Sequence, residues 1–402
     1  MSEDDSDAEL AVGADAFAGA GAGLEVAVVG AGAVGATTAY DLARRGASVT
    51  LYDSGSVASG SSGRAAGLCY DAFASALDAE IASDAIERFR AFSGDDTFPF
   101  VECPYVWLAR EGDDAREDAI REQVDRMQRN GVVALEMTGV ELGERFPALR
   151  SDDVAVAAVA GAAGYTDPAQ YTACLAAAAT GAGATLESNT PVNVSFDPPR
   201  IEPVDADGRA VGEREVDVVV VTAGAHTKRL LADAGIPIAM KPYRVQALVA
   251  DAALEEPMCY DATDGFYVRP HPDGILVGNG TEPVEADPDA YDRSASPAFL
   301  EGIPSRVGSR LEGVDLEIDR SWAGLCTATP DRDPLVGELR SGLFVATGFQ
   351  GQGFMRAPAI GERLAGMVLG DGDGDLERFD PTRFAGDESF EIVEGMGVES
   401  EN

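Results

Sequence analysis

Residues 26–53 read VAVVGAGAVGATTAYDLARRGASVTLYD, and this stretch decides the fold of the chain. The apolar run 26–29 is typical of a buried parallel strand. Residues 33–45 have the character of a helix that ends before Gly46, and residues 47–52 form a second apolar strand. A Gly-x-Gly-x-x-Gly sequence joins the first strand to the helix, and an acid follows the second strand. This βαβ unit predicts a dinucleotide-binding site.

Each residue of the motif has its own expected task. Gly30 permits the tight turn, Gly32 lets the backbone approach a pyrophosphate, and Gly35 lets the helix pack closely on the strand. The phosphates are expected at the helix N-terminus, where free N–H groups and the helix dipole favour negative charge. Asp53 is expected to accept hydrogen bonds from the adenosine ribose. A glycine-rich turn without a ligand is the alternative, and this unit alone does not distinguish NAD from FAD.

The composition is that of a large, strongly acidic globular protein. The chain has 402 residues, 45% of them hydrophobic, and a formal net charge of -40. Such a charge makes nucleic acid and anionic membrane surfaces poor partners. Lys228 and Lys241 are the only lysines. Abundant acid with scarce lysine resembles proteins of salt-loving archaea, in which salt screens the self-repulsion, and an ordinary acidic protein is the alternative.

Three features of the sequence favour a cytoplasmic protein that has no metal site. They are the cysteine pattern, the N-terminal residues and the hydropathy. The five cysteines are scattered and include no C-x-x-C pair, which argues against a disulfide framework, a zinc site or an iron–sulfur cluster. The chain begins MSEDDSDAEL, which has no export signal, and no apolar stretch is long enough to span a bilayer. The oligomeric state stays open.

Segments of dinucleotide-binding character recur three times, and two stretches of antiparallel character interrupt them. We therefore expect a discontinuous domain of α/β type and an inserted antiparallel-sheet α+β domain that carries the substrate. The dinucleotide-binding domain is expected to take residues 24–96, 163–237 and 321–375, the substrate domain 97–162 and 238–320, a disordered acidic tail 1–23, and a mobile acidic tail 376–402.

A second glycine-dense turn favours FAD over NAD. Gly348, Gly351 and Gly353 follow an apolar strand at 343–347, and a helix is expected from about residue 359. Reduced flavin carries negative charge at N1 and the C2 carbonyl, which backbone N–H groups at a helix N-terminus stabilise. A nicotinamide dinucleotide has no need of this second site. The alternative is a tight turn at the sheet edge.

Several further stretches carry a resemblance that covers residues 24–370. The chain resembles the D-amino acid oxidase superfamily of FAD-dependent amine oxidoreductases, which includes glycine and sarcosine oxidases. The matching stretches are the first βαβ unit, the loop 59–67, PVNV at 191–194, VVTAGA at 220–225, W-A-G at 322–324 with T-P-D at 329–331, and GFQGQGFMRAP at 348–358.

The resemblance implies a glutathione-reductase type of FAD-binding fold with non-covalent FAD. It also implies hydride transfer to flavin N5 from the carbon beside an amine. Besides the first βαβ unit, the positions that the resemblance assigns to the cofactor are Ser61, Ser62, Gly63, Arg64, Val192, Ala223, Gly224, Gly351, Gln352, Gly353 and Phe354.

The substrate positions depart from the family pattern. Cys326 stands where glycine and D-amino acid oxidases have a carboxylate-binding Arg, and Met355 stands where monomeric sarcosine oxidases have a Lys. Gly324 stands at the position of a flavin-bonding Cys, so a covalent link there is not expected. Cys326 and Met355 are therefore candidate substrate residues, and so are Arg269, Arg356 and Tyr267, with Arg64 and Arg244 as weaker choices.

These observations favour FAD-dependent oxidation of a small amine or amino acid, best a secondary amine of sarcosine, proline or opine type. Electrons would pass on to O₂ or to a redox protein. Neither His226 nor His271 is expected to act as a base, because a flavin supplies the demanding chemistry. Two alternatives stay open: a non-catalytic flavoprotein subunit or assembly factor, and an NAD-dependent dehydrogenase.

Overall fold

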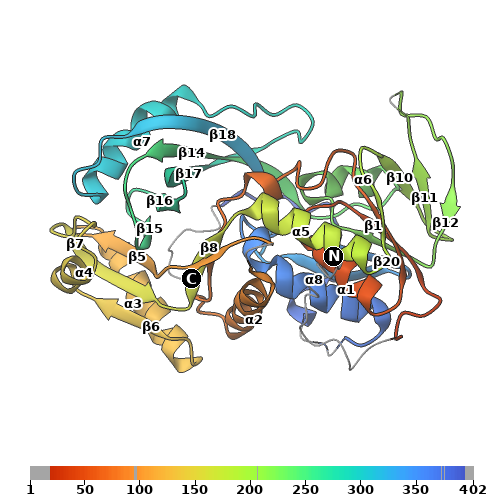
Figure 1. The fold of residues 1–402 in the computed structure, drawn as a ribbon, viewed down its shortest axis with the longest axis horizontal. Helices are drawn as coiled ribbons and strands as arrows, with labels where there is room; N and C mark the ends of the chain where they lie inside the picture. The colour runs from red at the N-terminus through yellow and green to blue at the C-terminus, as the bar shows by residue number, and fades with distance from the viewer. Residues whose placement is uncertain (1–18, 95–96, 206, 373, 375, 394–402) are drawn as a thin grey trace, which may run out of the picture.

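The computed structural model describes residues 19–94, 97–205, 207–372, 374 and 376–393. Two large sheets, of six and eight strands, dominate the architecture. In Figure 1 the six-stranded sheet and its helices α1 and α8 lie on the right, and the eight-stranded sheet with α7 lies on the left. The six-stranded sheet takes its strands from residues 25–52, 185–221 and 335–347, and the eight-stranded sheet takes its strands from residues 105–160 and 241–328.

The six-stranded sheet is built on the predicted βαβ unit. Its inner strands pair in parallel, and β19 pairs antiparallel at one edge. The carboxyl ends of parallel strands meet at one edge of a sheet, which is where open α/β sheets bind ligands. In order across the sheet, the strands are β19 (Leu335–Arg340), β20 (Leu343–Thr347), β13 (Val218–Val221), β1 (Glu25–Val29), β2 (Ser48–Tyr52) and β9 (Thr185–Glu187).

Both faces of this sheet are covered, because strand side chains alternate between its two sides. Val26 and Val28 pack on the side of the main helices, and Ala27 and Val29 pack on the opposite side. The helical side holds α1 (Ala33–Arg44), α2 (Ala76–Phe92), α5 (Pro168–Gly181) and α8 (Gly353–Leu369). The other side holds β10 (Val192–Ser195), β11 (Arg200–Pro203), β12 (Arg214–Glu215) and α6 (Thr227–Asp233).

The eight-stranded sheet is antiparallel except where β15 pairs with β5. Helices α4 (Gly139–Arg145) and α7 (Pro297–Arg310) cover one face, and α3 (Asp114–Arg129) packs on the other. Its strands run in the order β18 (Glu317–Ala328), β14 (Lys241–Asp251), β17 (Gly274–Glu285), β16 (Phe266–His271), β15 (Met258–Asp261), β5 (Tyr105–Arg110), β7 (Val154–Ala160) and β6 (Ala134–Met137). A small sheet of β3 (Leu68–Tyr70), β8 (Ala163–Thr166) and β4 (Phe100–Glu102) lies between the two large ones (Figure 1).

Two local expectations differ from the structure. Helix α8 begins at Gly353 and not near residue 359, with Pro358 inside it. Its first turns therefore start directly at the glycine-dense turn. Strand β7, whose sequence is VAVAAVA, gave no strand signal because alanine has a low strand propensity. Pairing with β5 and β6 and nearly complete burial stabilise it instead.

The expectation of a mobile C-terminal tail is wrong for residues 376–393. Phe379 and Ile392 are buried, and Lys241 donates a hydrogen bond of 2.5 Å from Nζ to the Phe390 carbonyl. The apolar residues of this acidic stretch are widely spaced in the sequence, and each packs against the protein separately. They therefore form no periodic pattern that could have predicted their burial. The expected N-terminal tail lies mostly outside the described residues. Within the described part of the chain, no helix is long and apolar enough to cross a membrane.

Candidate active site

The turn between β1 and α1 can be built only with glycine. Gly30 has a φ of +112°, and a Cβ on it would lie 2.5 Å from the Thr222 carbonyl oxygen. A Cβ on Gly35 would lie 1.9 Å from the carbonyl oxygen of Gly30, which no rotation of a side chain can relieve. Gly32 is the N-cap of α1, and its open side faces the Ser62 hydroxyl. The turn therefore presents bare backbone to whatever binds there.

Asp53 is held at the end of β2 by backbone donors. Its Oδ2 accepts a hydrogen bond of 2.8 Å from the Ala31 N–H, and its Oδ1 accepts one of 2.8 Å from the Gly55 N–H. Each carboxylate oxygen keeps a further lone pair, so the group can also accept a hydroxyl. This geometry suits the expected contact with a ribose.

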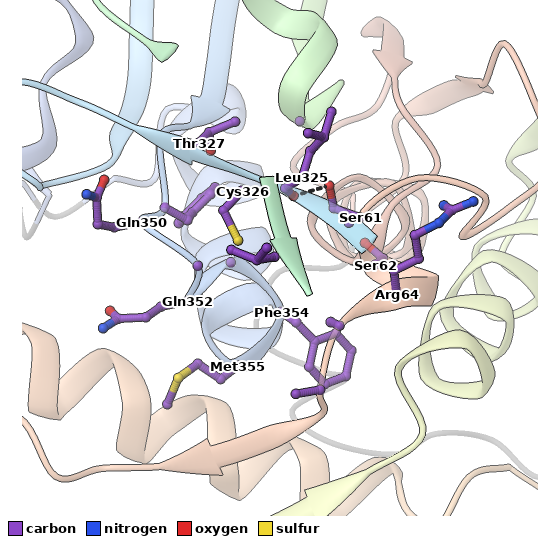
Figure 2. Close-up of a pocket in the computed structure, with 18 of the residues that line it drawn as sticks. Ser61, Ser62, Arg64, Leu325, Cys326, Thr327, Gln350, Gln352, Phe354 and Met355 are labelled. Atoms are coloured by element: carbon purple, nitrogen blue, oxygen red, sulfur yellow. Dashed lines mark hydrogen bonds between the residues drawn. The ribbon is translucent and has the colours of Figure 1, made fainter. Parts of the chain in front are cut away.

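The loop after β2 wraps across the α1 turn. The Ser62 hydroxyl accepts a hydrogen bond of 2.9 Å from the Ala33 N–H, in the first turn of α1. Ser61 donates to the Leu325 carbonyl at 2.6 Å, and the Trp322 indole donates to the Arg64 carbonyl at 3.0 Å. The loop is thereby fixed to β18 of the other sheet, as Figure 2 shows for the bond between Ser61 and Leu325. Gly63 packs on the Ala58 carbonyl, where a Cβ would clash at 2.3 Å.

The glycine-dense turn delivers the N-terminus of α8 to the same space. Gly351 has a φ of +87°, and Gln350 has one of +52°, a conformation that L residues rarely adopt. Gln352 is the N-cap and places no side-chain cap on the helix. The free N–H groups of a seventeen-residue helix therefore point to the region of Gly351, Gln352 and Gly353. Such a terminus stabilises negative charge.

A single cavity joins these parts. It contains about 1490 Å³ of empty space, a volume that includes space open to solvent. One end is lined by the α1 turn and the Ser61–Arg64 loop, and the other by the α8 turn and the inserted sheet (Figure 2). Of the predicted positions, those that line it are Gly32, Ser61, Ser62, Arg64, Gly224, Tyr267, Cys326, Gly351, Gln352, Gly353, Phe354 and Met355.

The other predicted cofactor positions lie behind this lining. Gly30, Gly35 and Gly63 shape turns, and Asp53 anchors the β2 end, without facing the cavity themselves. Val192 begins β10, on the far face of the six-stranded sheet. Ala223 lies just before the cavity residue Gly224.

Two predicted arginines lie outside the cavity. Arg356 pairs with Asp78 at 2.6 Å and also donates to Gln352 Oε1 at 2.5 Å. Arg269 is buried and donates to the carbonyls of Ala66 and Pro270, at 2.5 and 2.6 Å. Burial lowers the pKa of Arg269 to about 10, with neighbouring phenols and thiols opposing the shift. Both guanidinium groups therefore organise protein, and neither faces the cavity.

The substrate end of the cavity is neutral and rich in aromatic groups. Tyr243 and Cys326 are paired on neighbouring strands, and both lie close to Gly351. The Tyr267 ring lies across Gly278 of the next strand, where a Cβ would meet its hydroxyl oxygen at 2.1 Å. Tyr70 stacks on Tyr105, with ring centroids 4.2 Å apart and planes 4° apart. Burial raises the pKa of Tyr70 to about 12, against the influence of a nearby arginine.

Three polar residues of this wall were not predicted. Gln246, Asn279 and Thr281 line the cavity from β14 and β17, next to a register shift between Val245 and Gln246. Such bulges redirect side chains and occur often beside active sites. The available signal was weak, because single polar residues on or beside a strand usually mark a solvated face.

In the described part of the chain, no group of three or more His, Cys, Asp or Glu residues is arranged to hold a metal ion. The bare α1 turn, the Asp53 anchor and the uncapped N-terminus of α8 instead fit a flavin dinucleotide, with phosphates at the first helix and the pyrimidine edge at the second. Residues 25–367 match the family model described as DAO, FAD dependent oxidoreductase.

The chain belongs to this family. FAD is its cofactor, and its fold is the mixed α/β fold of FAD-dependent oxidoreductases. The solved structure of L-proline dehydrogenase from P. horikoshii is similar, with a TM-score of 0.81 at 27% identity, covering 90% of this chain and 97% of that one. Glycine oxidase from Geobacillus kaustophilus is 27% identical over 86% of this chain and 92% of its own length.

A third relative is longer than this chain. It is 4-methylaminobutanoate oxidase (formaldehyde-forming) from Paenarthrobacter nicotinovorans, 30% identical over 89% of this chain. The match spans only 45% of that relative's length. The family relationship thus covers nearly all of this chain but less than half of this relative.

Proposed function

We propose that the protein oxidises the C–N bond of a small amine or amino acid, with secondary amines as its best substrates. The observation that carries this is the single cavity, in which a dinucleotide cradle continues into a small neutral pocket walled by Tyr70, Tyr243 and Tyr267. Bound FAD supplies the hydride acceptor, held without a covalent bond because Gly324 offers no nucleophile. The relatives named for amine and amino acid oxidation support the same class of substrate.

The protein's own contribution is binding and orientation. The α8 N-terminus stabilises negative charge beside the Gly351–Gly353 turn, and the aromatic wall offers apolar surface at the substrate end. Among the described residues that line the cavity, none is Asp, Glu or His. The described lining thus offers no carboxylate or imidazole base, and we propose that the amine loses its proton to solvent before it reacts; a neutral pocket favours this because it stabilises the uncharged amine.

Anaerobic mixing of the purified yellow protein with a panel of amines tests this function. The flavin absorbance is expected to bleach with secondary amines and to return when a suitable electron acceptor is admitted. Rapid recovery with oxygen identifies an oxidase, and recovery only with an artificial dye identifies a dehydrogenase that serves a redox protein. A protein that takes up no FAD would refute the proposal.

A non-catalytic flavoprotein is the second candidate, and it is favoured by the absence of the family's carboxylate-binding residues at Cys326 and Met355. Its signature in the same experiment is distinct. The flavin would be bleached by dithionite and by no amine, and no amine would perturb its spectrum.

A further inference from the structure

We propose that the substrate carries no carboxylate beside the carbon that is oxidised, so that it is an N-alkyl amine with a neutral body. This inference rests on the proposed function and narrows it: within the secondary amines, it separates simple amines from sarcosine- and proline-like amino acids. It is drawn from the charges of the described residues in and around the cavity wall.

The wall of the cavity is almost free of charge. Among the described residues that line it, Arg64 is the one charged residue. Its guanidinium donates to the carbonyls of Ser59 and Gly60 and is exposed, and Figure 2 shows the side chain directed away from Cys326 and Met355. The stretches that the structure does not describe contain no Lys, Arg or His, so no further cation can come from them.

The cations on β14, on β16 and in the first turn of α8 are engaged by protein groups. Arg356 is paired with Asp78, and Arg269 is bound to two carbonyls, as described above. Arg244 binds Glu282 and the carbonyls of Asp292 and Ser294. Each would have to break these contacts to reach a ligand.

Lys241 is engaged in the same way. Its Nζ donates to the Phe390 carbonyl at 2.5 Å and lies 4.5 Å from the centre of the Phe390 ring. The remaining strong anion site is the α8 N-terminus, and the pyrimidine edge of the flavin would occupy it. A substrate carboxylate would thus enter the substrate end without a charged partner.

Burying an ionised carboxylate without such a partner is costly, whereas a neutral body incurs no such cost. The groups that do face the substrate end suit a neutral body. Tyrosine rings bind alkyl groups and attract ammonium groups over their faces. Asn279 and Thr281 offer an amide and a hydroxyl, which can bind a hydroxyl or amide of the substrate.

The reaction that follows is balanced. Bound FAD would accept a hydride from the C–H bond beside the nitrogen as that bond breaks, and the nitrogen lone pair would form a C=N bond. The resulting iminium takes up water and releases a proton: an acyclic amine then separates into a carbonyl compound and the shortened amine, and a cyclic amine opens to a single amino-carbonyl compound. FAD is the oxidant, and the substrate carbon is the atom oxidised.

Matched pairs that differ only in a carboxylate test the inference on the holoenzyme. Pyrrolidine is compared with L-proline, and dimethylamine with sarcosine, by anaerobic flavin bleaching and by the spectral shift on binding. We expect the carboxylate-free member to have at least about a tenfold higher ratio of bleaching rate to dissociation constant, since about 1.4 kcal/mol gives a tenfold preference. An equal or higher ratio for L-proline and sarcosine overturns the inference while leaving the proposed function intact. If no amine bleaches or perturbs the flavin, both are overturned.

Adding the missing cation gives an independent test. Cys326 faces the cavity beside Tyr243, so Cys326→Arg is expected to tighten sarcosine and L-proline binding by about tenfold and to weaken pyrrolidine binding. Cys326→Gln is the matched control of similar reach without charge, and Cys326→Lys repeats the test if Cys326→Arg loses FAD. Equal gains in the charged and neutral variants, or none in either cationic variant, contradict the inference.

Discussion

At the scale of single residues, the turn before α1 shows how sterics prepare a ligand site. The Cβ that Gly35 lacks would lie 1.9 Å from one backbone oxygen, and the missing Cβ of Gly30 would lie 2.5 Å from another. Both close approaches are to backbone atoms of this chain, and they leave the cavity side of Gly32 open. The glycines therefore bring the chain segments close enough together for their N–H groups to meet a phosphate.

Gly35→Ala is expected to weaken FAD binding by at least about tenfold, because overpacking costs about 1 to 3 kcal/mol and here displaces the turn itself. Titration of the apoprotein with FAD, followed by flavin fluorescence, measures the change. Gly60→Ala is the matched control, since nothing lies within 4 Å of its Cβ and its φ is not positive. Unchanged affinity in Gly35→Ala would contradict the steric account.

Tyr70 allows a prediction about pH. Burial raises its pKa to about 12, so its hydroxyl stays protonated through the range of about pH 6 to about 10 used for assays. It therefore cannot act as a base there, and bleaching should rise with pH as the substrate amine loses its own proton. We expect Tyr70→Phe to keep the wild-type shape of this profile. Loss of the inflection in Tyr70→Phe would identify Tyr70 as the titrating group.

At the scale of elements, buried polar contacts join pieces that lie far apart in the sequence. Arg88 of α2 pairs with Asp41 of α1 at 2.8 Å and donates to the Pro358 carbonyl of α8 at 2.7 Å. This links the two helices whose N-termini face the cavity. A second contact of this kind joins the turn before α8 to the segment at residue 393: the Gln350 side chain donates to the Val393 carbonyl at 2.7 Å.

The segment near residue 392 is therefore expected to support the active site. Ile392 is 7% exposed and packs in one cluster with Tyr243 and Ala328. Ile392→Ala should lower the free energy of unfolding by about 2 kcal/mol, measured by urea denaturation, because it leaves a cavity behind Tyr243. Val284→Ala is the control: Val284 is 70% exposed, and the change should stay within about 0.5 kcal/mol. Equal effects would show that the segment contributes nothing.

At the scale of the whole molecule, charge is the dominant feature. A formal net charge of -40 on 402 residues implies self-repulsion that opposes the folded state. Most ion pairs on the described surface are exposed and contribute little to stability. Stability should therefore depend on the surrounding salt more than on these pairs.

We expect the melting temperature to rise steeply between about 0.1 and about 1 M KCl, because the Debye length falls there from about 10 Å to about 3 Å. Above that range the rise should flatten, since screening is then nearly complete. Differential scanning calorimetry of the FAD-loaded protein measures the curve. A melting temperature that falls with salt would show that specific ion pairs outweigh the net repulsion.

The sequence by itself determined the parallel sheet, the dinucleotide cradle and the choice of flavin. These depend on short-range geometry, in which glycine, an apolar run and an acid at fixed spacing leave few backbone solutions. Through their place in the family pattern, the sequence also proposed Cys326 and Met355 as substrate residues, and it proposed Tyr267 as part of an aromatic pocket; all three line the cavity. The sequence did not predict the alanine-rich strand β7 or the packing of the segment after residue 376. Both are stabilised by partners that lie far away in the sequence.

Only the tertiary structure decided which charges reach the substrate. Arg356 lies within the motif at 348–358 and Arg269 lies on β16, yet Arg356 pairs with Asp78 and Arg269 donates to the Ala66 carbonyl. Gln246, Asn279 and Thr281 enter the wall because a register shift and the strand pairing direct them there. A side chain's partners are set by the folding of distant segments against it, which no local pattern encodes, and so the neutral character of the pocket emerged from the fold alone.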